Sequence, residues 1–219
     1  KLFYHTLTII IFLVAISMKP ETHFNTLIEA ASDTRRIQSG KPRQLISLEK
    51  KTEPVTFILH EGVVAIYRSS DRLLIKYIRG PMITGMNELI DTNAGIFIKA
   101  YKSVSYEILP TKEMLDVINT QELWKDASYC YMYAVRQLLL AHYSSVGLST
   151  YELIRLNLIA LMNEDEALSD HVNVSDYILE KTRLSRSRVM KILGDLRIGG
   201  YIEINRGILI KINKLPEKY

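Results

Sequence analysis

The residues most able to do chemistry are a group of cations near the C-terminal end of the chain. Arg186, Arg188 and Lys191 fall in the first two turns of a predicted helix. Ser185, just before them, can cap that helix by accepting a hydrogen bond from its first free N–H groups. The helix dipole favours anions at this end, so cations there indicate a phosphate backbone opposite them. The expected chemistry is therefore the binding of a polyanion.

Other kinds of chemistry have little support in the sequence. There is no evident nucleophile–base pair, metal-spaced set of histidines or phosphate-binding loop, so an enzyme is the weakest interpretation. We expect no catalytic residue, no metal site and no cofactor. The single Cys130 excludes an intrachain disulfide, and in a monomer it excludes a cysteine-ligated cluster or a cysteine-rich zinc site. A reducing, cytoplasmic compartment fits this cysteine usage.

The cations lie in a stretch that predicts two short helices joined by a tight turn, followed by a hairpin. The second helix ends at Gly199-Gly200, and two short strands then flank the turn signal Asn205-Arg206-Gly207. Apolar residues line one side of the second helix, away from the cations: Val189, Ile192, Leu193 and Leu196. A helix-turn-helix followed by a hairpin is a winged helix.

This stretch resembles the DNA-binding domain of the CRP/FNR family of bacterial transcription regulators. The resemblance lies in the spacing of residues 185–196, which fits the family's recognition helix, and in Gly200-Tyr201-Ile202, which fits the entry to its wing. It implies that Arg186 and Lys191 enter the major groove of double-stranded DNA. The residues expected to bind DNA are Ser185, Arg186, Ser187, Arg188, Lys191, Lys181, Arg183 and Arg206. Of these, Arg188, Lys181, Arg183 and Arg206 would contact phosphates and the groove beside the wing.

Ser187 stands where many relatives carry a glutamate that reads cytosine, so we expect an operator that differs from the usual half-site. The sequence also resembles the enterobacterial group called inhibitor of hydrogen peroxide resistance, in residues 182–187, 199–203 and 212–216. That resemblance implies a role in oxidative-stress gene control, and the family implies RNA polymerase as a further partner. The alternative is an adaptor that does not bind DNA and uses the N-terminal sheets and the long helix for contacts with other proteins.

Length and composition fit a protein of two small domains. The chain has 219 residues, 47% of them hydrophobic and 24% charged, which is an ordinary globular composition. The formal net charge is +4, and the basic excess is concentrated from Val174 onward. Such a local bias suits a polyanionic partner.

Residues 1–17 form an apolar segment of uncertain status. Their core, residues 7–16, is about as long as the core of a signal peptide and short for a membrane span. Three interpretations stay open. The segment is upstream sequence with Met18 as the natural start, which we favour, or a short membrane anchor, or an extra packed helix.

Residues 18–120 predict a lead-in helix and then a set of short strands. The strands are expected at residues 44–48, 55–59, 63–67, 73–78, 82–83, 96–101 and 104–109. Their order resembles the cyclic-nucleotide-binding β-roll, with residues 55–68 similar to its hairpin and residues 74–85 to the strand and glycine turn before its pocket. The predicted fold class is therefore α+β: a β-roll, a long helix and a C-terminal winged helix-turn-helix.

The roll departs from its relatives where a nucleotide would bind. Met86 follows Gly85 in place of a glutamate, and it cannot accept a hydrogen bond from a ribose hydroxyl. Asn93-Ala94-Gly95 occupies about the place of the arginine that would neutralise the cyclic phosphate, and burying a phosphate without a cation is unfavourable. We therefore expect no cyclic nucleotide. His60, His142 and Cys130 are isolated, so we interpret them as packing or surface residues rather than haem ligands.

Residues 121–146 predict the long helix that is the dimer axis in the family. Large residues recur at one heptad position and alanines at another, an arrangement that lets two helices approach closely. The expected dimer interface is Trp124, Ala127, Tyr131, Ala134, Leu138 and Ala141. Packing against the roll of the same chain is the alternative, and both can hold on different faces because Met132, Leu139 and Leu140 form a second apolar face.

Residues 147–219 are expected to form the DNA-binding domain. Ser149 and Glu152 fit a capping box at the start of its first helix. Residues 163–166 are an acidic connector that we expect to be solvated.

Overall fold

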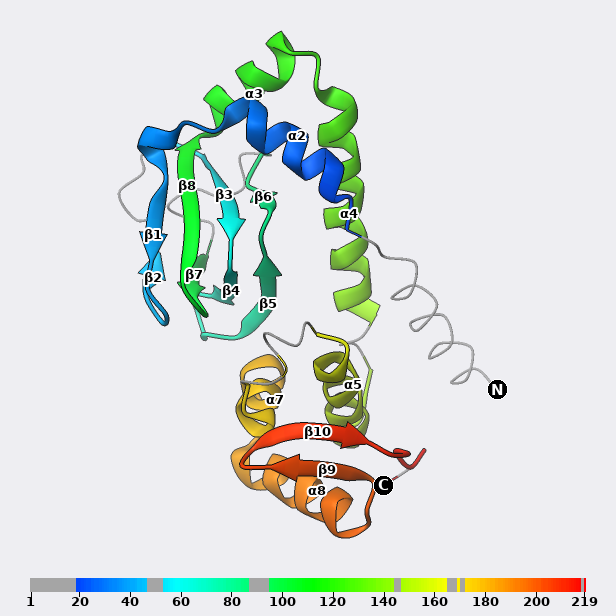
Figure 1. Cartoon of the computed structure of the whole chain (residues 1–219). Coiled ribbons are helices and arrows are strands. Elements are labelled where there is room, and N and C mark those ends of the chain that lie inside the picture. The colour runs from blue at the N-terminus through cyan, green and yellow to red at the C-terminus, as the bar shows by residue number, and fades with distance from the viewer. Residues whose placement is uncertain are drawn as a thin grey trace. The chain divides into compact units, whose positions relative to one another are not determined.

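The computed structural model of the chain describes residues 19–46, 53–86, 95–143, 147–164, 169, 172–217 and 219, and for 140–143 the backbone alone. The chain divides between Leu140 and Ala141 into two compact units (Figure 1). The apolar segment 1–17 lies outside the described residues. Across the ranges just given, no helix is both long enough and apolar enough to cross a bilayer.

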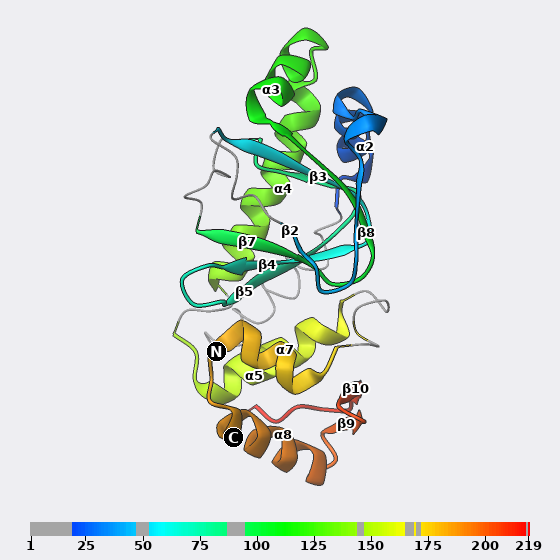
Figure 2. The ribbon, with the colours of Figure 1, turned by 90° about the vertical axis from the view of Figure 1, so that its left-hand side faces the viewer.

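Two antiparallel four-stranded sheets form the body of the first unit. One sheet has the order β1 (Gln38–Gly40), β8 (Val104–Pro110), β3 (Val55–Glu61) and β6 (Met82–Thr84). The other, which Figure 2 shows as neighbouring strands, has the order β2 (Leu45–Ile46), β7 (Ile96–Ala100), β4 (Val63–Arg68) and β5 (Leu74–Arg79). Apolar residues of both sheets, among them Phe57, Val64 and Ile98, share one buried cluster.

Helices cover a second core at one end of this unit (Figure 1). They are α2 (Glu21–Ala31), α3 (Thr111–Thr120) and α4 (Trp124–Tyr143). Phe24, Leu27 and Ile28 recur at helical spacing, and α2 buries them together with Ile58 of β3 and Ile118 of α3. The imidazole of His23 stacks on the ring of Tyr129 of α4 and lies 2.7 Å from Asp126.

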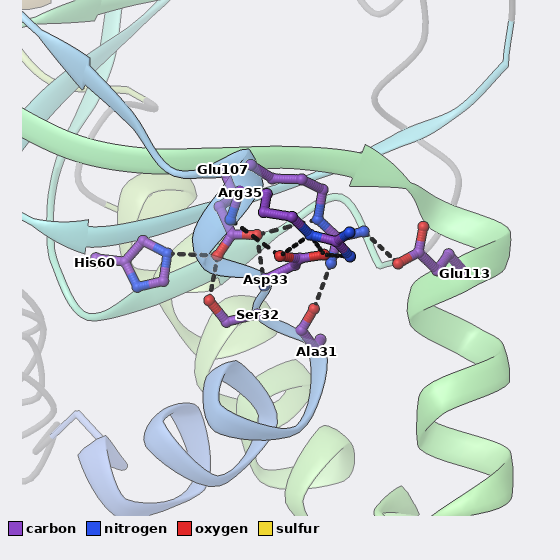
Figure 3. A network of polar contacts seen from close by, with 8 residues as sticks. Ala31, Ser32, Asp33, Arg35, His60, Glu107 and Glu113 are labelled. Atoms are coloured by element: carbon purple, nitrogen blue, oxygen red, sulfur yellow. Dashed lines mark hydrogen bonds and ion pairs between the residues drawn. The ribbon is translucent and has the colours of Figure 1, made fainter.

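A buried carboxylate joins the end of α2 to the sheets (Figure 3). Glu107 of β8 is fully buried, and its oxygens accept hydrogen bonds from the hydroxyl of Ser32 and, at 3.1 Å, from the amide of Asp33. His60 Nε2 lies 2.8 Å from one carboxylate oxygen, and Arg36 donates to the other at 3.2 Å. Burial alone would raise the pKa of Glu107, but these partners hold that pKa below its usual value. The interpretation of His60 as a packing residue fits this contact.

The described part of the second unit contains helices and a hairpin. They are α5 (Thr150–Met162), α7 (Val174–Thr182), α8 (Arg186–Ile198), β9 (Ile202–Asn205) and β10 (Ile208–Ile212). The predicted capping box is present at the start of α5, where Ser149 and Glu152 bond each other's backbone amides. The hairpin lies beside α8 in both views (Figures 1 and 2).

The α+β fold predicted from the sequence is confirmed: a β-roll, a long helix and a winged helix follow one another in that order. The strand β1 was missed, because its three residues lie where Gly40 and Pro42 indicated a break. The long helix clusters with the sheets up to Leu140 rather than standing as a separate segment.

Candidate nucleic-acid interface

The turn between α7 and α8 is built from polar residues. Arg183 ends α7 in the left-handed conformation, with φ of 56°, and its amide bonds to the carbonyl of Leu179. The hydroxyl of Thr182 donates to the Ile178 carbonyl at 2.6 Å and accepts from the Leu184 amide at 3.3 Å. These contacts set the direction in which α8 leaves the turn.

One face of α8 is buried and the other is exposed, as its spacing predicts. The buried stripe is Val189, Ile192, Leu193 and Leu196. Arg186, Arg188 and Lys191 are all exposed. Ser185 occupies the N-cap position, but its side chain makes no hydrogen bond to the backbone; its hydroxyl lies 3.4 Å from that of Ser187. The predicted capping bond of Ser185 is therefore wrong, and both hydroxyls are at the exposed start of the helix.

Arg186 has a partner that the sequence analysis did not identify. Its guanidinium donates to Asp176 of α7 at 3.1 Å, and both side chains are mostly exposed. Asp176 lies in the first turn of α7. A carboxylate in the first helix of a helix-turn-helix, together with an arginine at the first position of the second helix, is the pattern that could have predicted this ion pair.

Lys181 is directed into the domain. Its ammonium group donates to the hydroxyl of Tyr177 at 2.6 Å and lies 3.8 Å from the carboxylate of Glu164. Burial lowers the pKa of Lys181, and Glu164 counteracts part of that effect. This geometry does not fit the phosphate contact expected of Lys181, because the charge is already held inside the domain by Tyr177 and Glu164.

The wing presents Arg206 at its tip. Asn205 pairs with Ile208, so Arg206 and Gly207 form a two-residue loop, and their φ values of 48° and 85° are those of a type I′ turn. The predicted hairpin turn is confirmed. Arg206 is exposed. The wing therefore adds an exposed arginine to the three exposed cations of α8.

The wing is attached to the start of α7. The amide of Val174 donates to the carbonyl of Gly207 at 2.8 Å, and Asn173 caps α7 by accepting from the amides of Ser175 and Asp176. A Cβ atom on Gly207 would lie 2.3 Å from the side-chain nitrogen of Asn173. Glycine is required at this point by the contact as well as by φ.

On α4 the alanines and the larger residues have different environments. Ala127 is fully buried in the core of its own unit, and Tyr131 is partly buried with its hydroxyl 2.9 Å from the Met86 carbonyl. Ala134 is exposed, and the side chain of Ala141 lies outside the described residues. Large apolar side chains are also exposed along this helix: Trp124, Met132, Val135, Leu138 and Leu139. The alanine row therefore begins in the core of the unit at Ala127 and is exposed by Ala134.

The region of the expected nucleotide pocket is described in part. Met86 is buried among residues of α2, β6 and α4, so its side chain fills the helical core. Asn93 and Ala94 lie outside the described residues. Cys130 is buried in the same core, and desolvation, with a smaller effect of Asp126, raises the pKa of its thiol to about 12. The side chain of His142 is likewise outside the described set.

Within the described ranges, no group of three or more His, Cys, Asp or Glu residues is arranged to hold a metal ion. Residues 150–217 match the family model described as winged helix-turn-helix DNA binding, which covers the second unit from α5 to the tail after β10.

Solved structures of similar fold are transcription regulators. The c-di-GMP responsive global regulator CLP of Xanthomonas campestris superimposes with a TM-score of 0.69 at 15% identity, over 88% of this chain and 100% of that one. A transcriptional regulator of the CRP/FNR family from Thermus thermophilus has a TM-score of 0.51 at 20% identity, over 80% of this chain and 93% of that one. These identities show the fold alone.

A sequence relative gives the family. The inhibitor of hydrogen peroxide resistance of Escherichia coli strain K12 is 33% identical over 205 residues, which are 92% of this chain and 98% of that protein. The match runs through both units rather than through the winged helix alone. The chain thus belongs to the inhibitor of hydrogen peroxide resistance family, and its fold is that of the CRP/FNR transcription regulators.

Proposed function

We propose that this protein is a sequence-specific regulator of transcription that binds double-stranded DNA as a homodimer in the cytoplasm. The observation that carries the proposal is the exposed face of α8, where Arg186, Arg188 and Lys191 are presented while the opposite stripe is buried. A helix of this kind fits the major groove, with its N-terminal residues against the base edges. Arg206 and Arg183 add cations on the wing and in the turn.

The cations have different roles in this proposal. Arg186 and Lys191 contact base edges, and Arg188, Arg183 and Arg206 contact phosphates. Ser185 and Ser187 lie at the helix start, where hydroxyl groups can bond to phosphate oxygens or to bases. Lys181 is left out, because its ammonium group is enclosed by Tyr177 and Glu164.

The dimer forms through α4. Large apolar side chains form an exposed row on α4: Trp124, Met132, Val135, Leu138 and Leu139. From Met132 onward the row has steps of three (Met132 to Val135, Val135 to Leu138) and four (Val135 to Leu139), the spacing of a helix that packs on another helix. Large exposed apolar side chains in one row indicate an interaction surface rather than an ordinary solvated face. A twofold dimer would present two winged helices to an inverted repeat.

The target genes are proposed to be those of the oxidative-stress response, by analogy with the relatives' name. Cys130 is not the sensor of peroxide in this proposal, because the thiolate is the reactive form and burial keeps the pKa of this thiol at about 12. Cyclic nucleotides are not effectors, since Met86 packs in the core where relatives that bind them have a polar side chain. RNA polymerase remains a proposed partner.

The experiment is an in vitro selection of bound duplexes from a random DNA library, followed by gel shifts at several salt concentrations. The expected result is an enriched inverted repeat whose affinity falls steeply with salt, with a slope that counts the phosphates contacted. If no sequence is enriched and binding is absent at low salt, the proposal fails and the winged helix serves protein contacts instead.

A further inference from the structure

The exposed face of α8 carries apolar side chains between its cations. Met190 is 50% exposed and Ile198 is 83% exposed. Gly194 lies between them, and a Cβ atom added there would meet nothing within 4 Å. Packing within the chain does not account for this face, since the buried stripe of the helix is on its other side.

Met190 lies inside the arc that the base-reading cations define. At about 100° per residue, Met190 is about 40° around the helix from Arg186 and about 100° from Lys191, so it falls between them. It also belongs to the N-terminal half of α8, which is the half that enters a major groove. If Arg186 and Lys191 reach the base edges, the thioether of Met190 reaches them too.

The surface that Met190 would meet is almost entirely polar. The edges of base pairs in the major groove present hydrogen-bond donors and acceptors, and their one apolar group is the C5-methyl of thymine. A methionine side chain makes hardly any hydrogen bonds, but it is flexible and packs well against apolar groups. Placing it against any other base edge would desolvate polar atoms without replacing their bonds.

We propose that Met190 is a specificity-determining residue that contacts the methyl group of a thymine in each half-site. The proposal rests on the proposed DNA binding of α8 and adds to it the base that this helix position selects. The surrounding charge favours DNA over a protein as the occupant of this face. Arg186 and Arg197 flank Met190 on one side, and Lys191 and Arg188 follow on the other, all of them exposed.

The test separates the methyl group from every other feature of the base pair. Duplexes selected by the full-length wild-type protein are resynthesised with deoxyuridine in place of each thymine of the half-sites, one position at a time. We expect one position per half-site at which uracil weakens wild-type binding about fourfold, the factor for one methyl group removed from an apolar contact. Met190→Ala should bind the thymine and uracil duplexes equally at that position.

Ile198→Ala is the matched control, because Ile198 is also apolar and exposed on α8 but lies near the C-terminal end of the helix. It should keep the wild-type ratio between thymine and uracil. If the wild type binds both duplexes alike at every position, or if Met190→Ala keeps the discrimination, the inference is overturned while DNA binding stands. If the wild type enriches no sequence at all, both the inference and the proposed function fail.

Discussion

The carboxylate of Asp176 holds the guanidinium of Arg186 at 3.1 Å across the turn between α7 and α8. Both side chains are exposed, so this ion pair contributes at most about 1 kcal/mol to stability. Its effect is on the arginine proposed to read a base: Asp176 limits the positions that Arg186 can take and places a negative charge beside the DNA-binding face. On random DNA, where no matching base is present, Arg186 must leave or share this carboxylate to reach a phosphate instead.

Asp176→Asn is therefore expected to raise affinity for random DNA more than affinity for the selected operator. The ratio of operator affinity to random-DNA affinity should fall about two- to fivefold, in line with the strength of an exposed ion pair. Gel shifts on both duplexes measure the ratio. Glu203→Gln, which removes an exposed carboxylate from β9, is the control and should leave the ratio unchanged. Equal effects of the two variants would mean that Asp176 acts through its charge alone.

Arg186→Ala and Arg188→Ala should have different signatures. The two residues lie about 160° apart around α8, so they cannot reach base edges equally. Arg186→Ala should cost about 1–3 kcal/mol on the operator and relax the preference at one base pair per half-site. Arg188→Ala should weaken all sequences alike and flatten the salt slope by about one unit. If Arg186→Ala weakens random DNA as much as the operator, Arg186 contacts only phosphates.

Val135→Glu should convert the proposed dimer into monomers. Val135 is 54% exposed in the middle of the apolar row on α4, and a twofold axis there would bring the two new carboxylates together. Like charges at an interface cost several kcal/mol, so the dimer dissociation constant should rise about a hundredfold or more in sedimentation equilibrium. Ala134→Glu, at the edge of that row, should have a smaller effect, and Lys112→Glu on the exposed side of α3 should have none. A dimer that survives Val135→Glu would place the interface on another surface.

Glu107 should make the stability of the protein dependent on acid. The pKa of Glu107 is lower in the folded protein than in the unfolded chain, so its contribution is present above the unfolded value of about 4.3 and is lost as the pH falls through the folded value. Glu107→Gln should lower the free energy of unfolding by about 3 kcal/mol at neutral pH, because it breaks a buried charged network. Chemical denaturation at several pH values should also show that the free energy of unfolding of this variant falls less steeply than that of the wild type as the pH is lowered. Glu113→Gln, which removes a half-exposed partner of Arg36, should cost less than about 1 kcal/mol.

Gly207→Ala should destabilise the winged helix by about 1–3 kcal/mol, because the new Cβ would carry a positive φ and press on Asn173. Gly200→Ala is a matched control: its φ of 69° is also positive, but nothing lies within 4 Å of its Cβ position. The difference between the two variants in thermal unfolding therefore measures the contact with Asn173. Equal losses would show that only the backbone conformation matters.

The sequence predicted the elements of this fold well where a local pattern defines them. The buried stripe of α8 and the capping box of α5 follow from helical spacing and from one pair of residues, and the wing turn follows from Asn205-Arg206-Gly207. Each of these depends on residues a few positions apart. Tertiary context changed little at such sites.

Contacts between distant segments were not predictable in the same way. The network around Glu107 gathers groups from β3, β8 and the segment just after α2, and no spacing in the sequence brings them together. Lys181 is a cation in a basic stretch, and only the fold brings Glu164 and Tyr177 around it. Ala127 shares a heptad position with Ala134, yet only the first is buried, because the roll covers one end of that row.

The bond from the Val174 amide to the Gly207 carbonyl also ties the motion of the wing to that of α7. The wing tip cannot swing away from the helix-turn-helix without exposing the first amide of α7 to water. In the protein without DNA, hydrogen exchange at this one amide therefore reports how often the wing opens. A DNA duplex that engages Arg206 would slow that exchange at a site which it does not touch.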